Sequence, residues 1–443
     1  MNKLIKRLML AGAATMIGAL GFAGVGWAQE AASADAAETA FIFNTFSFLF
    51  NGALVMWMAA GFCMLESGLV RSKSAATICT KNIGLYSIAG LMYFLVGYNL
   101  MYDGVDGGYF GSFTWLNSTD PGYDGTGDYS TPSDWFFQMV FVATAASIVS
   151  GALAERIKLW PFLIFVVLLT GIIYPIQGAW QWGGGWLSEA GFSDFAGSTI
   201  VHSVGGWAAL TGAILLGARK GKYGANGSVH PLPGSSLPLA TLGTFILWLG
   251  WFGFNGGSQL ALGTGADAAA MSQIFANTNL AAAGGVIAAM ILTQVLYKKV
   301  DLTMALNGAL GGLVSITAEP LAPSFLSAVL IGGFGGVLVV IAVPLLDKLK
   351  IDDVVGAIPV HLVCGIWGTI AVPFTNDGTG FGTQLLGIVA IGAFVVIAST
   401  IVWLVLKMTV GIRLDEESEA LGADQAELGL EAYPEFGQGS QRI

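Results

Sequence analysis

The sequence predicts an all-α polytopic membrane protein of eleven transmembrane helices, built as two five-helix inverted repeats and a final long helix. Three observations predict this fold: the composition is strongly apolar, the basic residues fall in alternate connections, and one sequence pattern occurs twice. A soluble protein with one very large core is the alternative, but such a protein would still need a polar shell.

The composition is that of a chain largely immersed in lipid. Hydrophobic residues make up 55% and charged residues 10% of the chain, and the mean hydropathy is +0.72. A soluble domain carries about 25% charged residues, so this chain lacks the material for a water-facing surface. Its 63 glycines in 443 residues suit helices that pack closely in a bilayer.

The N-terminus resembles a secretory signal. A basic start precedes an apolar stretch from Leu8 to Val25 and a small-x-small cleavage site at Gly26-Trp27-Ala28. We therefore expect residues 1–28 to be a removed signal peptide, with an uncleaved first helix as the alternative. The transmembrane domain would then span residues 29–412, followed by an acidic cytoplasmic tail over residues 413–443.

Apolar windows of about 20 residues, long enough to cross a bilayer, recur along the rest of the chain. They lie near residues 41–69, 83–102, 135–154, 159–177, 198–217, 237–260, 270–297, 302–318, 324–346, 355–374 and 383–410. The first five and the next five windows form the two predicted repeats, over about 41–217 and 237–374.

The basic residues provide an independent check of this count. Beyond the predicted signal, each follows an odd-numbered window or lies in the tail: Arg71, Lys73, Lys81, Arg156, Lys158, Arg219, Lys220, Lys222, Lys298, Lys299, Lys348, Lys350, Lys407, Arg413 and Arg442. Positive charge is enriched on the cytoplasmic side of membranes. We therefore expect a multi-pass inner-membrane protein with its N-terminus outside and its C-terminus in the cytoplasm.

The predicted outer connections are acidic. The longest contains Asp103, Asp106, Asp120, Asp124, Asp128 and Asp134. A negative mouth would concentrate cations, although simple solvation of a loop explains the same residues equally well. The tail, also acidic, is expected to be a solvated cytoplasmic segment that can meet a partner.

The pattern D-x-x-G-x-x-x-V-H-x-V-x-G occurs twice, over residues 194–206 and 353–365. It belongs to the fifth and tenth windows, the last of each five-helix unit. Five is an odd number, so the two units cross the membrane in opposite senses. Inverted repeats place a functional site at their interface near the midplane, whereas chance similarity between glycine-rich helices is the alternative.

Two of the three histidines, His202 and His361, occupy equivalent positions in this pattern. Ionisable residues within membrane spans are costly and usually face a pathway, so we expect both to line one. Asp194 and Asp353 precede these helices, where a carboxylate can cap free backbone N–H groups. A zinc site is the rival reading of the histidines, but no third ligand lies close in sequence and the cysteines form no CxxC pair.

Aromatic residues gather near the predicted outer ends of the helices. Phe137 and Phe141 lie one turn apart, while Trp251, Phe254 and Ser258 follow helical i, i+3, i+7 spacing. Most such aromatics are membrane anchors. An aromatic face can also hold a cation, with a contribution of about 2 kcal/mol when the site is desolvated.

At these residues the chain resembles the ammonium transporter (methylammonium permease/Rhesus) family. The similar segments cover essentially the whole mature chain: Asp194 to His202, Trp182 to Gly185, Gly151 to Arg156, Trp251 to Ser258, Asp353 to Gly368 and Glu66 to Lys73. The resemblance implies a homotrimer with one conduction path in each subunit.

The resemblance also implies roles for individual residues. Trp182, Phe141 and Ser258 would form an outer ammonium-recruiting site, shaped by Asp194. Phe137 and Phe141, with Phe254 as neighbour, would form a stacked aromatic gate. His202 and His361 would be the paired histidines of a narrow pore, with Trp251 in its wall.

The predicted function is therefore a channel-type transporter that recruits ammonium and conducts ammonia, with or without a relayed proton. It is not expected to be an enzyme, to need a cofactor or metal, or to bind nucleic acid. The alternatives are an ammonium sensor that signals through its tail and an intramembrane metalloenzyme. A PII-type nitrogen regulator is a possible cytoplasmic partner, although Leu428 stands where the family often has histidine.

Overall fold

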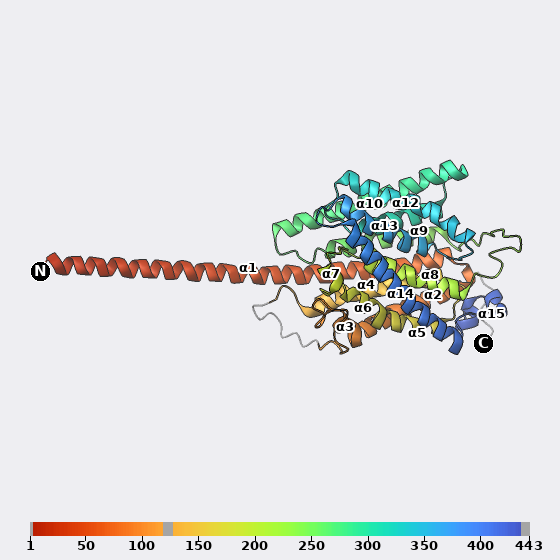
Figure 1. Cartoon of the computed structure of the whole chain (residues 1–443), viewed down its shortest axis with the longest axis horizontal. Helices are drawn as coiled ribbons and strands as arrows, with labels where there is room; N and C mark the ends of the chain where they lie inside the picture. Colours follow the sequence, from red (N-terminus) through yellow and green to blue (C-terminus); the bar gives the residue numbers. More distant parts are fainter. Residues whose placement is uncertain (1–2, 118–126, 436–443) are drawn as a thin grey trace.

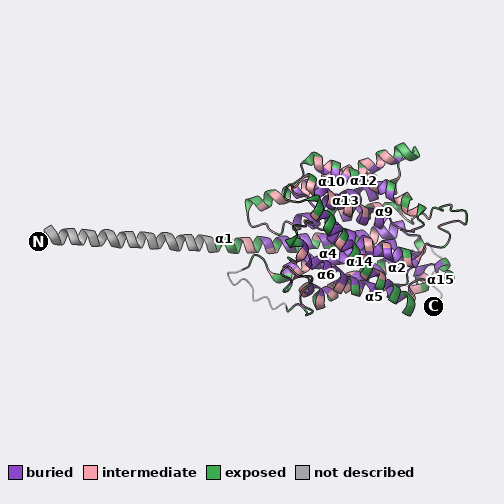
Figure 2. Cartoon of the chain, in the orientation of Figure 1, coloured by how far each residue is buried: buried purple, intermediate pink, exposed green. Residues whose placement is uncertain are grey.

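The computed structural model describes residues 3–117 and 127–435, with side chains from residue 35 onward. This part of the chain is helical and contains only two isolated β-bridges. Most helices run roughly side by side in one bundle (Figure 1). Buried residues concentrate in its middle and exposed ones on its outside (Figure 2).

Each predicted membrane crossing corresponds to a helix or to consecutive helical segments. In chain order the crossings are α1 (Lys3–Leu69); η1 (Ser72–Ser74), α2 (Ala75–Met92), η2 (Tyr93–Gly97) and α3 (Tyr98–Tyr102); α4 (Thr131–Ala152); α5 (Leu159–Leu168), η3 (Leu169–Ile173) and α6 (Tyr174–Ala179); η4 (Ser198–Ser203) and α8 (Val204–Leu216); α9 (Leu237–Gly257); α10 (Gly265–Tyr297); α11 (Leu302–Ile316); α12 (Phe325–Lys348); η5 (Ile358–Val363), α13 (Cys364–Ala371) and η6 (Val372–Phe374); and α14 (Phe381–Thr409). The short α7 (Trp186–Glu189) lies between the fourth and fifth crossings, and α15 (Glu416–Leu421) and η7 (Asp424–Leu428) belong to the tail.

The predicted number of spans is confirmed. Within the described residues, nine helices are long and apolar enough to cross a membrane, and Leu302–Ile316 and Ile358–Phe374 are two shorter apolar helices. The predicted boundaries differ from the observed ones mainly because polar residues extend the helices beyond their apolar centres. At α10, Thr264 and Asp267 form a capping box that starts the helix five residues before the predicted window.

The predicted signal peptide, residues 1–28, falls where no side chain is described, and it stays a prediction. The apolar crossing within α1 runs from Asp35 to Leu69. This first crossing packs against α9, the first helix of the second repeat. The last helices of the two repeats also meet, because η4 and α8 contact η5 and α13. The two halves therefore interlock through equivalent elements.

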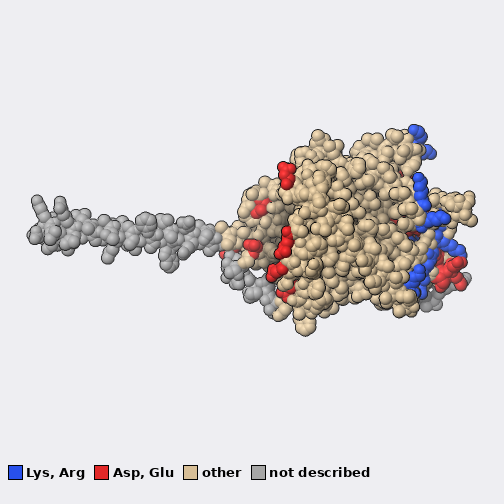
Figure 3. Space-filling view, in the orientation of Figure 1, with Lys and Arg blue, Asp and Glu red and all other residues tan. Residues whose placement is uncertain are grey.

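Charged residues lie at the two ends of the bundle (Figure 3). Lys and Arg gather at the end where the tail lies, whereas Asp and Glu mark the end from which α1 projects. The side face between them carries almost no charge. This arrangement is that of a multi-pass membrane protein, with an apolar belt between two polar ends.

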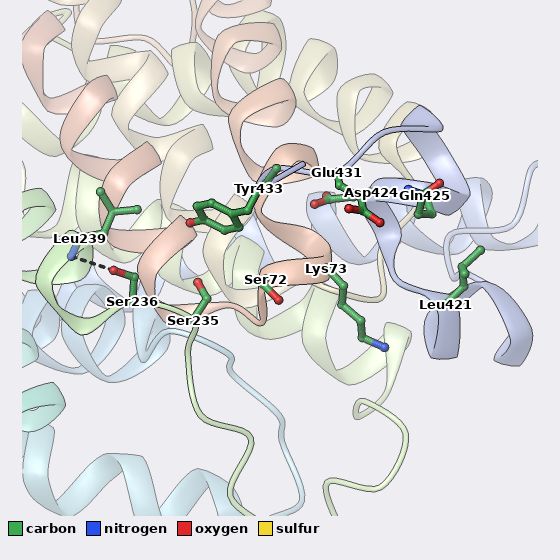
Figure 4. A pocket seen from close by; sticks show the side chains of 11 residues that line it. Ser72, Lys73, Ser235, Ser236, Leu239, Leu421, Asp424, Gln425, Glu431 and Tyr433 are labelled. Atoms are coloured by element: carbon green, nitrogen blue, oxygen red, sulfur yellow. Dashed lines mark hydrogen bonds between the residues drawn. The ribbon is translucent and has the colours of Figure 1, made fainter. Parts of the chain in front are cut away.

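The tail is docked on the basic end of the bundle, so the expectation of a freely solvated tail is wrong for residues 416–428. The carboxylate of Asp424 accepts hydrogen bonds from the backbone nitrogens of Ala76 and Thr77, at 2.9 and 2.7 Å. Glu427 accepts one from the nitrogen of Leu159, at 2.8 Å. The tail thereby caps the first turns of α2 and α5. Figure 4 shows Asp424 beside Lys73, in a cavity between the tail and the ends of α1 and α9.

A buried charge network joins the connections at this same end. Glu155 accepts hydrogen bonds from the Arg71 backbone nitrogen and Nε, at 2.9 and 2.6 Å, and lies 3.2 Å from Arg219 Nη1. Arg219 Nε in turn pairs with Asp352 at 2.8 Å. These four residues come from the segments after α1, α4, α8 and α12. The network therefore holds both repeats together at the basic end.

Replacing Glu155 by glutamine is expected to destabilise the fold strongly. The Glu155 and Arg219 side chains are 0% and 3% exposed. Removing one partner of a buried ion pair costs about 3–5 kcal/mol, because the other charge stays buried without compensation. A lower thermal unfolding midpoint in detergent would show this. Glu416→Gln, which breaks the exposed pair with Lys220, is the matched control and is expected to change the midpoint little.

The same network makes the stability of the fold depend on pH. Burial alone favours the neutral form of Asp352, but hydrogen bonds from Arg219 and the charges of Arg156 and Arg219 lower its pKa from 3.8 to about 2. A carboxylate whose pKa is lower in the folded state stabilises the fold above its unfolded pKa. This contribution is therefore full at neutral pH and is lost as the pH falls through about 2.

Candidate functional site

A cavity of about 560 Å³ opens on the acidic end of the bundle. It brings together Phe137, Phe141, Trp182, Asp194 and Ser258 from the third and sixth crossings and the connection before the fifth. The family resemblance implied an outer site of Trp182, Phe141 and Ser258 shaped by Asp194, and a gate that includes Phe137. All five residues line this one cavity. The indole of Trp182 is held by a hydrogen bond of 2.9 Å from its Nε1 to the Asp194 carbonyl oxygen.

Several further polar residues of this cavity were not predicted site residues, although Asp134 was noted in the acidic outer connection. They are Tyr98, Tyr102, Tyr129, Asp134, Gln138 and Gln181. The Tyr98 hydroxyl donates to the Asp134 carboxylate at 2.6 Å, so a buried acid and a ring hydroxyl share the wall. Tyr98 and Tyr102 lie four residues apart at the end of a crossing. This spacing places both hydroxyl-bearing rings on one helix face and could have indicated them.

Aromatic rings form the floor of the cavity. The rings of Phe141 and Phe254 overlap, with centroids 4.0 Å apart and planes at 30°. Phe137 meets Phe141 edge-on at 4.8 Å and 61°, and Trp182 meets it edge-on at 6.0 Å and 84°. All three residues that the resemblance implied for the gate are thus in contact, and the smallest distance between ring centroids is that between Phe141 and Phe254.

The two histidines lie directly beneath this floor and touch each other. Nδ1 of His202 is 3.1 Å from Nδ1 of His361, and the ring centroids are 5.2 Å apart. The His202 ring also lies 5.2 Å from the Phe254 ring and stacks on Trp251 at 4.9 Å. Both histidines are buried, at 0% and 3% exposure. The two histidines that occupy equivalent positions in the repeated pattern thus lie side by side.

Each histidine sits in a π-helical turn that an aspartate caps. The Asp194 carboxylate accepts hydrogen bonds from four backbone nitrogens, those of residues 197 to 200, at 2.8–3.0 Å. Asp353 accepts them from residues 355, 356 and 358 at 2.6–3.3 Å. Gly197 and Gly356 have φ of 105° and 84°, a left-handed conformation that favours glycine. The D-x-x-G part of the repeated pattern thus starts both histidine-bearing turns.

Trp251 is fixed in the wall beside the histidines. It is fully buried, and its Nε1 donates to the Thr317 hydroxyl at 2.8 Å. A buried indole with its one donor satisfied cannot rotate without losing that bond. Trp251 therefore holds a flat apolar surface against the His202 ring.

Two further cavities lie on the opposite side of the histidines. His361, Phe62, Glu66 and Gly151 line a small one of about 10 Å³. A larger cavity of about 230 Å³ opens among Arg219, Lys222, Asp347 and Asp353, at the basic end. Asn307, Val355 and Gly356 line both. From the acidic end to the basic end, the order is thus the outer cavity, the aromatic floor, the two histidines and the two inner cavities.

The described part of the chain contains no cluster of side chains suited to binding a metal ion. No group of three or more His, Cys, Asp and Glu side chains could hold an ion there.

Comparison with known proteins agrees with this architecture. The sequence model of the Ammonium Transporter Family matches residues 46–433. Ammonium transporter Amt2 of Archaeoglobus fulgidus is 41% identical over 418 residues, covering 88% of this chain and 87% of that protein. A putative ammonium transporter of Synechocystis is 41% identical over 416 residues, covering 92% of this chain and 93% of its own.

Solved structures show the same fold. The structure described as "Sensor Amt Protein" has a TM-score of 0.83 at 36% identity and covers 88% of this chain and 99% of its own. Candida albicans Mep2 has a TM-score of 0.76 at 26% identity, covering 86% of this chain and 88% of its own. The chain therefore belongs to the Ammonium Transporter Family, a family of membrane transporters rather than enzymes.

Proposed function

We propose that the protein recruits ammonium in the outer cavity and conducts ammonia past His202 and His361 to the basic end. The observation that carries the proposal is the order of groups along one line: an aromatic cavity with a buried acid, a floor of overlapping rings, and two buried imidazoles in contact. The outer cavity suits a cation, because ring faces and the Asp134 carboxylate attract positive charge. In this proposal Trp182, Phe141 and Ser258 bind ammonium, and Asp194 shapes the site.

The region beneath the cavity suits a neutral molecule. Phe141, Phe254 and Trp251 are at most 1% exposed and present carbon surface. An ammonium ion there would lose its hydration without a charged partner, which is costly in a low-dielectric interior. Ammonia is neutral and small, so it bears a smaller penalty. Phe137, Phe141 and Phe254 act as the gate, and the imidazoles beyond it offer hydrogen-bond partners.

Trp182→Leu and His202→Ala are expected to impair transport in different ways. Loss of the indole removes a cation-binding face worth about 2 kcal/mol, so the half-saturating ammonium concentration should rise about tenfold or more. Loss of the imidazole removes the polar partner beyond the gate, so the maximal rate should fall. Ammonium-dependent flux into proteoliposomes measures both.

Matched controls exist for each change. Trp160 is 71% exposed on α5, and His230 is exposed in the connection before α9. Trp160→Leu and His230→Ala should transport like the wild type. Equal flux for Trp182→Leu and wild type would contradict the recruitment site. Equal ammonium currents after replacement of both His202 and His361 would remove the pair from any proton relay.

An ammonium sensor is the second candidate function. It is favoured by the likeness to the structure titled "Sensor Amt Protein" and by a tail whose Asp424 and Glu427 cap α2 and α5, because such contacts couple the tail to the transmembrane helices. Truncation of the tail separates the candidates: a sensor would lose a nitrogen response and keep uptake.

Assembly and orientation complete the proposal. The family resemblance supports a homotrimer, and the basic end of the bundle (Figure 3) supports a cytoplasmic location for the tail in an inner membrane. A PII-type nitrogen regulator would then meet the protein at that face. Light scattering of the purified protein tests the trimer, and protease access to the tail from either side of the membrane tests the orientation.

A further inference from the structure

Two ionisable side chains are buried within the bundle near the histidines, and the proposed pathway has so far given them no role. Glu66 on α1 and Lys81 on α2 are each 1% exposed. Charged groups are rarely retained in a membrane interior without a function, because burying them costs free energy. Their positions relative to the pathway therefore matter.

Ser150, in the last turns of α4, connects the two residues. Its hydroxyl donates to Glu66 Oε2 at 2.7 Å, and its carbonyl oxygen accepts from Lys81 Nζ at 2.8 Å. Lys81 Nζ also lies 5.0 Å from the centre of the Phe162 ring. Lys81 is thus satisfied by a helix C-terminus and a ring face. Glu66 is not: its Oε1 is buried and has no hydrogen-bond partner among the described residues.

Glu66 lines the small inner cavity, and so does His361. The cavity volume of about 10 Å³ is close to the minimum for one water molecule. Gly151 lies beside Glu66: a Cβ there would come within 3.5 Å of the carboxyl carbon. A Cβ would also lie 2.6 Å from Val355 Cγ2, so the glycine allows Val355 and the Glu66 side chain to pack closely beside the cavity.

We propose that Glu66 is the proton-exchange residue on the inner side of the histidine pair, an inference that rests on the proposed function. Ammonia that leaves His361 takes the proton of the Glu66 carboxylic acid: the O–H bond breaks, an N–H bond forms, and the electron pair stays on the carboxylate. The new ammonium ion is held by Oε1 before it enters the larger inner cavity. A hydronium ion from the inner solution then returns a proton to the carboxylate.

The dependence of inward flux on inner pH tests this inference in proteoliposomes that contain the full chain. The other titratable groups near Glu66 are Cys63 on its own helix, Cys79 and Lys81 on α2, and His361 on η5. Flux is measured with the inner solution between about pH 6 and about pH 8. Glu66→Gln is expected to flatten this profile and to lower the rate at least about tenfold, since a positioned acid contributes about that much or more to proton transfer. Glu66→Asp keeps the acid and should restore part of the rate and the profile.

Glu319→Gln is the control, because Glu319 is a buried acid at the opposite end of the molecule that accepts a hydrogen bond from Asn376 at 2.6 Å. It should keep the wild-type profile. A Glu66→Gln protein with the wild-type rate and profile would overturn the inference and leave the proposed function intact, whereas absence of ammonium flux in the wild type would remove the proposed function itself. If Glu66→Gln does not fold, Ser150→Ala decides: it removes the donor to Oε2, and an unchanged profile would contradict the inference.

Discussion

Replacement of Gly206 by alanine is expected to abolish ammonium flux and to lower the stability of the fold. A Cβ on Gly206 would lie 2.7 Å from the Leu362 nitrogen and 2.8 Å from its Cα, closer than carbon atoms approach in folded proteins. The backbone of η5 would have to move, and Leu362 adjoins His361. Overpacking of this kind costs about 1–3 kcal/mol or more, and a small shift is enough to break the contact between the histidines. The thermal unfolding midpoint in detergent and flux in proteoliposomes measure the two effects.

Gly333→Ala is the matched control, since Gly333 also lies within a crossing helix but a Cβ there would meet nothing closer than 3.7 Å. Alanine favours the helix at such a position, so stability and flux should be retained. The prediction would be wrong if Gly206→Ala transported at the wild-type rate. That result would mean that the two repeats can separate at their crossing without disturbing the histidine pair.

Replacement of Asp194 by alanine is expected to have the second large effect. Four buried backbone N–H groups at the start of η4 would lose the carboxylate that accepts their hydrogen bonds. Each buried donor left unsatisfied costs about 1–3 kcal/mol. The π-helical turn that carries His202 should therefore unwind, and flux should be lost together with thermal stability.

Asp353→Ala provides the internal comparison, because Asp353 caps three N–H groups of the equivalent turn in the second repeat. It should show the same loss to a smaller extent. Asp194→Asn keeps one acceptor oxygen and should fall between alanine and the wild type. An Asp194→Ala protein with normal stability and lost ammonium binding would instead give the carboxylate a direct role in binding.

The fold was largely predictable because lipid imposes simple rules on a sequence. Eleven apolar windows and the segregated basic residues reflect the hydrophobic thickness of the membrane and its charge asymmetry, and neither depends on packing detail. The contact between His202 and His361 was predictable because a repeated pattern implies equivalent positions in two interlocked units.

What could not be predicted depends on rotation and long-range contact. Helical spacing placed Phe137 and Phe141 on one face of α4, but it did not define how α4 is turned relative to α9. Which of the two rings lies nearer to Phe254 could therefore not be derived from spacing. The docking of the tail was missed for a similar reason. Nothing local indicates that the Asp424 carboxylate meets the free N–H groups of a helix 347 residues away.

The contact between the two Nδ1 atoms of the histidines makes the pair directional. A hydrogen bond between two like nitrogens needs a hydrogen on one and a lone pair on the other, so two neutral rings must adopt opposite tautomers. One free Nε2 then offers a lone pair, while the other offers a hydrogen. A molecule that passes the pair therefore meets a hydrogen-bond acceptor at one ring and a hydrogen-bond donor at the other. If the molecule transfers a proton along the pair, both rings change tautomer. They must return to their first tautomers before the next molecule can do the same.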